Sequence, residues 1–326
     1  MIITRTPLRV SFAGGGTDLR AFYGRERGAV LSTAIDKYIY ITVNPKFDHR
    51  IRASYSVTEI VDRPDQLKHE LIREALRLAG VEGGVEITSI SDVPSQGTGL
   101  GSSSSYTVGL LHALYAFTGR FANAERLAAE ACRIEIEICG KPIGKQDQYI
   151  AAYGGLQHIQ FNPDESVFVD PIPCAPGLRA RLQESLLMLY TGTTRSANDV
   201  LREQRRGTEA GGATADGLRK LRDLADQLRD ALCAGQLDGF GEILDAGWRL
   251  KRELAPGITN ADIDRWYDRA RAAGAIGGKL LGAGGGGFLL LHAHPERHDD
   301  IRRALPELRP MPFRFEPQGS KIIFIQ

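Results

Sequence analysis

The sequence predicts a globular α+β protein organised in two halves, and the pattern of apolar residues supports this prediction. Alternating or β-branched residues dominate the start of the chain, at 1–12, 29–43 and 85–90, which favours strands. Helical periodicity appears near 66–80, 102–118 and 123–139, and Asn123 is well placed as an N-cap. We therefore expect a sheet-rich first half in which the helix near 66–80 packs between strands.

A proline-rich stretch, DPIPCAPG at 170–177, separates the two halves because proline breaks regular elements. A strand-like run, LLMLYTG at 186–192, follows it and leads into charged, helical sequence that continues to about residue 253. Within this helical part, GTEAGGATADG at 207–217 predicts a mobile loop and a candidate lid. Strands return at GFLLLHA and KIIFIQ, around a helix near 296–305.

The charge balance and the apolar content exclude several classes of protein. Lys and Arg number 41 against 40 Asp and Glu, so no overall field favours nucleic acid or an anionic membrane. No apolar stretch approaches the length of about 18 residues that a membrane span needs, and the start, MIITRTPLRV, lacks a signal-peptide pattern. We therefore expect a soluble, cytoplasmic protein whose partner is a small molecule.

The stretch GTGLGSSSSYTVGLL at 97–111 is typical of a phosphate-binding loop. Its glycines permit positive φ and close approach of a ligand, and its serines open a helix whose free N–H groups and positive dipole end attract an anion. A flexible Gly/Ser connection is the alternative, but such linkers do not normally run straight into an amphipathic helix. The pattern matches neither a Walker P-loop nor a Rossmann turn. The candidate phosphate-binding residues are Gly97, Gly99, Leu100, Gly101, Ser102, Ser103 and Ser104.

Further segments supply glycines and acids that could turn a phosphate site into a reaction centre. PLRVSFAGGGTD at 7–18 is a strand that ends in glycines, which permit close approach of a ligand, and in an acid that suits sugar hydroxyls. IEIEICGKPIGKQDQ at 134–148 places acids on a mostly apolar helix and after a Gly/Pro turn. KLLGAGGGGFLLL at 279–291 has a glycine run between strand-like pieces, for which a crowded hairpin is an equal explanation on its own.

Together, PLRVSFAGGGTD, VPSQGTGLGSSSS and KLLGAGGGGF resemble the three motifs of the GHMP kinases, in order and with suitable spacing along nearly the whole chain. The resemblance implies a ribosomal S5 domain 2-like N-terminal domain, a ferredoxin-like C-terminal domain and an active site between them. We place the N-terminal domain at 1–175, with the phosphate loop and the catalytic aspartate, and the C-terminal domain at 176–326.

The resemblance also implies roles for individual residues. Asp147 matches the catalytic aspartate that orients or deprotonates the attacking hydroxyl, and Arg9 matches the basic residue of the first motif. Ser103 and Glu135 match the ligands of Mg²⁺, while Glu137 is expected to face solvent from the same helix. On the residues alone, Asp147 could instead be an exposed turn aspartate and Arg9 a surface charge.

Sugar binding is expected at the first motif and at basic residues near it. Gly15, Gly16, Thr17 and Asp18 are the candidates from the first motif, together with Asp147. A phosphorylated sugar also requires basic groups far from the reacting hydroxyl. Arg195 is the first choice for them, with Lys145 and Lys37 as the other candidates. Lys145 could also lower the pKa of the aspartate or lie in solvent.

Within the family, the chain resembles the sugar-kinase branch that contains heptose 7-phosphate kinases, with L-fucokinase-like enzymes nearby. The residues that carry this resemblance include SFAGGGTDLRAFY, GAVLSTAIDKYIYITV, QDQYIAAYGGL and YTGTTRSA. It implies an ATP- and Mg²⁺-dependent enzyme that phosphorylates D-glycero-D-manno-heptose 7-phosphate at the anomeric oxygen. The 1,7-bisphosphate would feed nucleotide-activated heptose for bacterial lipopolysaccharide or capsule. The alternatives are an anomeric kinase for another free sugar and a non-catalytic sensor of ATP and sugar; the resemblance allows a homodimer.

Overall fold

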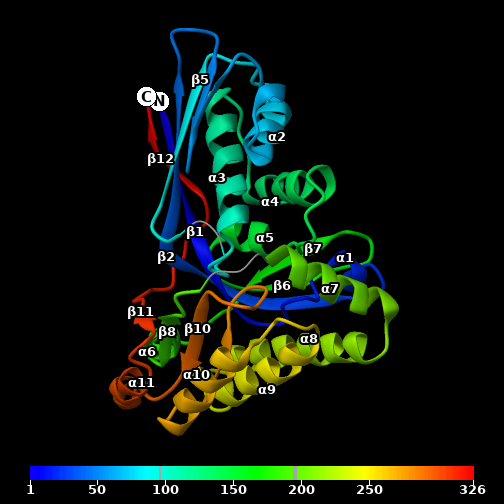
Figure 1. Ribbon diagram of the computed structural model, residues 1–326, viewed down its shortest axis with the longest axis vertical. Helices are drawn as coiled ribbons and strands as arrows, with labels where there is room; N and C mark the ends of the chain where they lie inside the picture. The colour runs from blue at the N-terminus through cyan, green and yellow to red at the C-terminus, as the bar shows by residue number, and fades with distance from the viewer. Residues whose placement is uncertain (95–96, 194–196) are drawn as a thin grey trace.

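Two long antiparallel strands, β1 (Ile2–Ala13) and β2 (Gly28–Pro45), run through the first half of the protein in the computed structural model, which describes residues 1–94, 97–193 and 197–326 (Figure 1). Their register pairs Ile2 with Val43 at one end and Ala13 with Leu31 at the other. The register shifts next to Pro7, where a bulge accommodates a residue without a backbone N–H. β1 thereby carries the first glycine motif, which follows Ala13, to the middle of the molecule.

The sheet around this pair has eight strands and is mostly antiparallel. Along its main path the strands are β12 (Lys321–Ile325), β1, β2, β5 (Val85–Ser91), β3 (Ile51–Ser54) and β4 (Thr58–Val61). At the other end of β2, the hairpin of β6 (Leu156–Phe161) and β7 (Val167–Pro171) pairs with residues 28–33. β2 therefore pairs with β6 through its first residues and with β5 through its last residues.

Helices cover one face of this sheet, and α3 is the central one (Figure 1). A Cβ at Gly109 would lie 2.6 Å from the Thr6 hydroxyl, so glycine lets α3 approach β1 closely. The Thr4 hydroxyl donates to the Gly109 carbonyl at 2.9 Å, which fixes α3 along the strand. The helices of this half are α1 (Arg20–Tyr23), α2 (Glu70–Ala79), α3 (Ser102–Phe117), α4 (Ala124–Cys132), which continues as a π-helical segment (Arg133–Ile138), and α5 (Gln146–Tyr153); a 3₁₀ turn (Pro64–Gln66) precedes α2.

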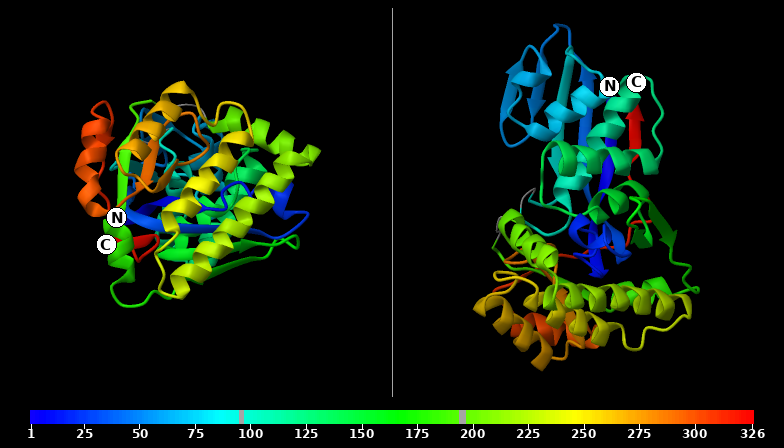
Figure 2. Two further views of the ribbon diagram at one scale, coloured as in Figure 1. Left: turned by 90° about the horizontal axis from the view of Figure 1, so that it is seen from below. Right: turned by 90° about the vertical axis from the view of Figure 1, so that its right-hand side faces the viewer.

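The second half is built on a four-stranded sheet with the order β11 (Arg309–Pro310), β8 (Leu186–Tyr190), β10 (Phe288–His292) and β9 (Gly277–Leu280). The long helix α8 also packs against β2 of the first half, and Figure 2 shows α8 and α9 lying across that end of the molecule. The helices of the second half are α6 (Leu178–Glu184), α7 (Ala197–Ala210), α8 (Ala213–Cys233), α9 (Phe240–Glu253), α10 (Ala261–Ala272) and α11 (His298–Ala304), with a 3₁₀ turn (Pro295–Arg297) before α11.

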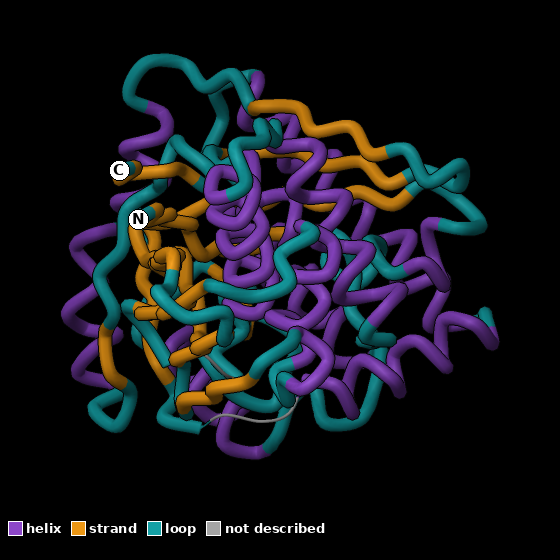
Figure 3. The backbone as a smooth tube through the Cα atoms, turned by 90° about the horizontal axis from the view of Figure 1, so that it is seen from above, coloured by secondary structure: helices purple, strands orange, loops and turns teal. Residues whose placement is uncertain are grey.

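The chain returns to the first sheet at its end, because β12 pairs with β1. The amino group of Met1 donates to the Gln326 carbonyl at 2.8 Å, and Figure 3 shows the two termini side by side. The division of the chain at residue 175 stays a prediction. Within the described ranges, none of the helices is both long and apolar enough to cross a membrane.

The expected strands and helices are present, but the mobile loop predicted at 207–217 is wrong. α7 extends to Ala210 and α8 starts at Ala213, so only Gly211 and Gly212 interrupt the helices, both with positive φ. Gly217 lies inside α8, where a Cβ would be 3.0 Å from a methyl of Leu254. These glycines therefore allow close packing and a tight turn instead of a lid. The sequence analysis also missed β3, β4, β6 and β7.

Candidate active site

A cavity of about 1140 Å³ lies where the three glycine-rich segments meet. A Cβ at Gly99 would lie 2.3 Å from the Leu281 carbonyl oxygen, and one at Gly282 would lie 2.4 Å from the Cα of Gly99. The loops at 97–101 and 281–287 therefore touch backbone to backbone, which only glycines permit. Gly15 and Gly16 of the first motif also line this cavity.

The N-terminus of α3 opens into the cavity. Gly101 is its N-cap in the left-handed region, with φ of 76°, and no side chain caps the helix. Ser103 is exposed, whereas Ser102 and Ser104 are buried beside it, and all of them line the cavity together with Gly97, Gly99 and Gly101. Leu100 is fully buried and its carbonyl accepts a 3.1 Å hydrogen bond from the Arg9 amide. The free N–H groups of this first turn are suited to bind phosphate oxygens.

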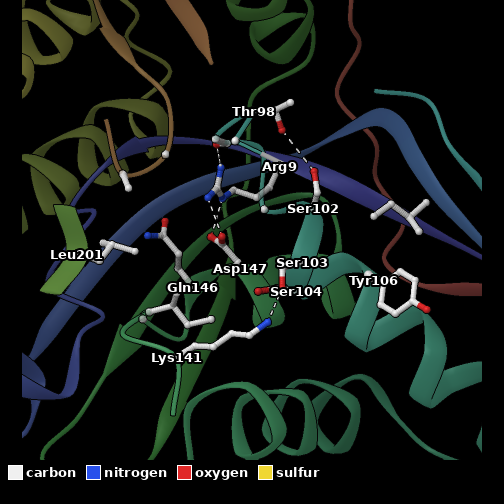
Figure 4. Close-up of a pocket in the computed structure, with 18 of the residues that line it drawn as sticks. Arg9, Thr98, Ser102, Ser103, Ser104, Tyr106, Lys141, Gln146, Asp147 and Leu201 are labelled. Atoms are coloured by element: carbon white, nitrogen blue, oxygen red, sulfur yellow. Dashed lines mark hydrogen bonds and ion pairs between the residues drawn. The ribbon is translucent and has the colours of Figure 1, made fainter. Parts of the chain in front are cut away.

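Arg9 and Asp147 form a bidentate ion pair at the same end of α3 (Figure 4). The Nε–Oδ1 and Nη2–Oδ2 distances are both 2.7 Å, and Arg9 also donates through Nη1 to the Gly99 carbonyl. Arg9 comes from β1 and is 4% exposed, while Asp147 lies in the first turn of α5. The pair therefore ties the phosphate loop to a carboxylate that faces the cavity.

A second acidic group, Glu135, lies behind the helix start and is fully buried. Ser103 donates to its Oε1 at 2.5 Å and Gln148 donates to its Oε2 at 2.6 Å. Burial raises the pKa of Glu135, although the hydrogen bond from Ser103 and the charge of Lys141 oppose this rise. Glu137 is exposed, as its position two residues further on predicted.

The pair of Ser103 and Glu135 fits a magnesium ion. Mg²⁺ prefers oxygen ligands and is usually held by only one or two carboxylates, with the remaining positions taken by water and substrate phosphates. A buried carboxylate that accepts only from neutral donors also gains from a nearby cation. The nearest cation among the described residues is the ammonium of Lys141, 4.0 Å from Oε1. These two residues could therefore hold the ion beside the phosphate loop.

The residues of the first motif divide into cavity-lining and structural groups. Asp18 lines the cavity but is only 3% exposed, and its carboxylate accepts from the amides of Gly16 at 2.9 Å and Gln146 at 3.2 Å. Burial raises the pKa of Asp18, and the backbone N–H of Gly16 opposes the rise. Asp18 thus ties the motif to the start of α5. The buried Thr17 hydroxyl donates to the carbonyls of Gly14 in the same turn and of Ala29 in β2. Thr17 is not among the residues that line the cavity.

Two of the basic residues expected to hold a sugar phosphate, Lys145 and Lys37, are not among the residues that line the cavity. Lys145 pairs with Glu165 at 2.5 Å and lies over the ring of Tyr23, and Lys37 pairs with Asp36 at 3.1 Å. Arg195 lies outside the described residues. A role for each of them in substrate binding stays a prediction.

The structure brings in lysines that the sequence analysis missed. Lys141, Lys251 of α9 and Lys279 of β9 all line the cavity, and Lys251 and Lys279 are buried. Lys279 is the first residue of the third glycine-rich segment, so its position offered a signal. Lys251 offered none, because it lies in a charged amphipathic helix with two other basic residues, of which Arg249 is exposed and Arg252 is half-buried.

Comparison with known proteins agrees with this arrangement. Residues 67–155 match the N-terminal domain of the GHMP kinases, and residues 228–309 match their C-terminal domain. The chain belongs to the GHMP kinase family. The predicted α+β fold of this family is confirmed, and the glycine-rich segments that resembled the family motifs are the ones that surround the cavity of this GHMP kinase.

Two curated relatives and one solved structure are similar over most of this GHMP kinase. The D-glycero-alpha-D-manno-heptose 7-phosphate kinase of Campylobacter jejuni is 29% identical, over 98% of each chain. The bifunctional fucokinase/GDP-fucose pyrophosphorylase of Arabidopsis thaliana is 27% identical over 92% of this chain but only 31% of its own length. The crystal structure of a D-glycero-D-manno-heptose 1-phosphate kinase from Bacteroides thetaiotaomicron has a TM-score of 0.83, with 26% identity and full coverage of both chains.

Proposed function

We propose that this protein is a sugar kinase of the heptose branch, which transfers the γ-phosphoryl group of ATP to the anomeric oxygen of D-glycero-D-manno-heptose 7-phosphate. The observation that carries the kinase chemistry is the bidentate pair of Arg9 and Asp147 beside the open N-terminus of α3. Support for the acceptor comes from the Campylobacter relative, whose similarity spans 98% of both chains.

The residues around the cavity suit an in-line phosphoryl transfer. The N–H groups at the start of α3 hold phosphate oxygens, and Ser103 with Glu135 would hold Mg²⁺, which supplies neutralising charge to the phosphates. Asp147 keeps lone pairs free on each oxygen after pairing with Arg9, so it can accept a hydrogen bond from the attacking hydroxyl and take its proton. The bond from the sugar oxygen to phosphorus forms as the bond from phosphorus to the ADP oxygen breaks.

Two other acceptors have specific support. The Arabidopsis relative is in part a fucokinase, which favours a free sugar as the second candidate. The Bacteroides neighbour is a heptose 1-phosphate kinase, in which case the anomeric oxygen would already be phosphorylated and another hydroxyl would react. Both alternatives keep the roles of Asp147 and Arg9 and change only the sugar and the hydroxyl placed beside them.

A coupled ADP-release assay across sugars and sugar phosphates tests the proposal. We expect D-glycero-D-manno-heptose 7-phosphate to have the highest kcat/KM, clearly above free heptose, heptose 1-phosphate, mannose, fucose and galactose. Phosphorus NMR of the product should show a new anomeric phosphate. Preference for fucose would replace the heptose proposal, and ATP binding without turnover on any sugar would favour a sensor.

A further inference from the structure

Two buried lysines face the cavity from the second half of the protein. Lys251 of α9 is 8% exposed and Lys279 of β9 is 6% exposed, and both line the cavity. A Cβ at Gly277 would lie 1.8 Å from the Gly241 carbonyl oxygen, so glycine lets β9 and α9 pack closely enough to bring both lysines to one wall. Leu201 and Gln204 of α7 also line the cavity.

Neither lysine has an acidic partner. Lys251 donates to the Gly282 carbonyl, and Lys279 donates to the Phe12 carbonyl at 3.1 Å. Among the residues that the structure describes, no carboxylate oxygen lies within 4.0 Å of either ammonium group. Each ammonium retains further N–H donors that these carbonyls do not use.

Burying an ammonium group without a counter-ion is unfavourable. Burial lowers the pKa of Lys251 to about 8, and it lowers the pKa of Lys279 well below its usual value. The charge of Arg9 adds to both shifts, and the charge of Lys251 adds to that of Lys279. An anion bound beside these two groups would stabilise the charged form of both lysines.

The position of the pair indicates the acceptor side of the cavity. Lys279 donates to the carbonyl of Phe12, which lies just before the first glycine motif. Gly15, Gly16 and Asp18 of that motif, where sugar binding is expected, line the same cavity. Asp147 already shares its charge with Arg9, and Asp18 is held by backbone amides. Neither carboxylate is therefore available to neutralise the lysines.

We propose that Lys251 and Lys279 form an anion subsite that binds a phosphate group on the acceptor side of the cavity. The chemistry requires a phosphate dianion, which two sources can supply: the acceptor's own phosphate or the phosphoryl group in transfer. The first source rests on the function proposed above, and the second requires only that the protein is a kinase.

The test compares Lys251→Met and Lys279→Met with wild type. Lys46→Met is the matched control, because Lys46 pairs with Asp48 at 3.1 Å and does not line the cavity. Methionine keeps the length and apolar stem of lysine without the charge, and Lys279→Arg, which keeps the charge, is the rescue variant. Binding of inorganic phosphate and of heptose 7-phosphate is measured by calorimetry without ATP. Loss of a charged hydrogen bond should weaken binding about 10-fold or more in both methionine variants and leave the control unchanged.

Calorimetry also measures the number of protons that the protein takes up when the anion binds. A bound dianion stabilises the charged form of both lysines, so wild type should take up protons on binding near pH 8.5, seen as an enthalpy that depends on the buffer, and Lys251→Met should take up fewer. A purely structural role for the lysines would not produce this uptake. Unchanged phosphate affinity and proton uptake in both methionine variants would overturn the subsite.

Kinetics distinguish the two sources. A rise in KM for heptose 7-phosphate with free heptose unaffected assigns the subsite to the acceptor's phosphate. A fall in kcat for both sugars assigns it to the transferred phosphoryl group. If wild type phosphorylates no heptose, the proposed function fails, while the calorimetric comparison still decides the subsite.

Discussion

The guanidinium of Arg9 holds both carboxylate oxygens of Asp147 at 2.7 Å, and it also donates to the carbonyl of Gly99 in the phosphate loop. One buried cation on a rigid strand therefore sets the position of the candidate base relative to the phosphate-binding backbone. Because planar, bidentate pairing fixes orientation as well as distance, Arg9 is a positioning residue for Asp147, in addition to the fixed positive charge expected from the sequence.

Asp147→Asn should lower kcat by roughly 10² to 10⁴-fold, the usual contribution of a positioned acid or base. The amide is nearly isosteric, so the fold and nucleotide binding should persist. Turnover is measured with the ADP-coupled assay, and nucleotide affinity by calorimetry. Near wild-type turnover in the folded variant would remove Asp147 from the chemistry.

Arg9→Lys should lower kcat strongly while ATP affinity changes little, because lysine keeps the charge but cannot contact both oxygens. The effect of Arg9→Ala should shrink when it is introduced into Asp147→Asn, since residues that act as a unit are not additive. Rate measurements on the four proteins of this cycle give the coupling. Simple additivity would show that Arg9 acts independently of Asp147.

The fold was largely predictable because its long elements carry strong periodicity. β1, β2 and α3 have continuous apolar patterns and lie where the sequence placed them. Strands β3 and β4 are only 4 residues long each, which is too short for an alternating pattern to stand out in the sequence. The stretch at 207–217 was misinterpreted because glycine indicates flexibility by composition, whereas Gly217 is used for close packing of α8.

The site was predictable only where a residue adjoins a glycine motif or matches the family. Ser103 contacts Glu135 and Arg9 pairs with Asp147, while the roles that the resemblance implies for them stay predictions. Lys251 could not be predicted, since its burial depends on the packing of α9 against β9 across a distance of some 30 residues in sequence. Contacts of this kind depend on tertiary structure, which local patterns do not encode.

Ser103→Ala and Glu135→Gln should each raise the magnesium concentration needed for half-maximal activity. Both remove an oxygen ligand or its charge from the candidate metal site. Glu137→Gln is the matched control, because Glu137 is exposed on the same helical segment. Magnesium titrations of the coupled assay measure the effect, and equal shifts in both glutamine variants would contradict the assignment to Glu135.

Gly99→Ala should abolish most activity and reduce stability by more than Gly119→Ala. Both glycines have positive φ, 75° and 69°, so both substitutions carry a similar backbone cost of about 1 kcal/mol. Only at Gly99 would the new Cβ collide, at 2.3 Å from the Leu281 carbonyl oxygen; in the described structure nothing lies within 4 Å of a Cβ at Gly119. Thermal melts and kcat of the two variants make the comparison, and equal losses would exclude the loop contact as the cause.

Lys251→Met should stabilise the protein at neutral pH, and the gain should fade in alkaline solution. In the folded protein burial lowers the pKa of Lys251 from 10.5 to about 8, which corresponds to a cost of up to about 3 kcal/mol when the group is charged in both states. Below pH 8 the folded and unfolded chains both carry the proton, so the full cost applies. Between pH 8 and 10.5 the folded chain has lost the proton that the unfolded chain still binds, and wild-type stability rises with pH.

The difference in the free energy of unfolding between Lys251→Met and wild type should therefore be largest near pH 7 and smaller at pH 9.5, as measured by denaturant titration. A residue that costs stability without a counter-ion is expected at a binding site, and a variant less stable than wild type at pH 7 would show that the ammonium is already neutralised.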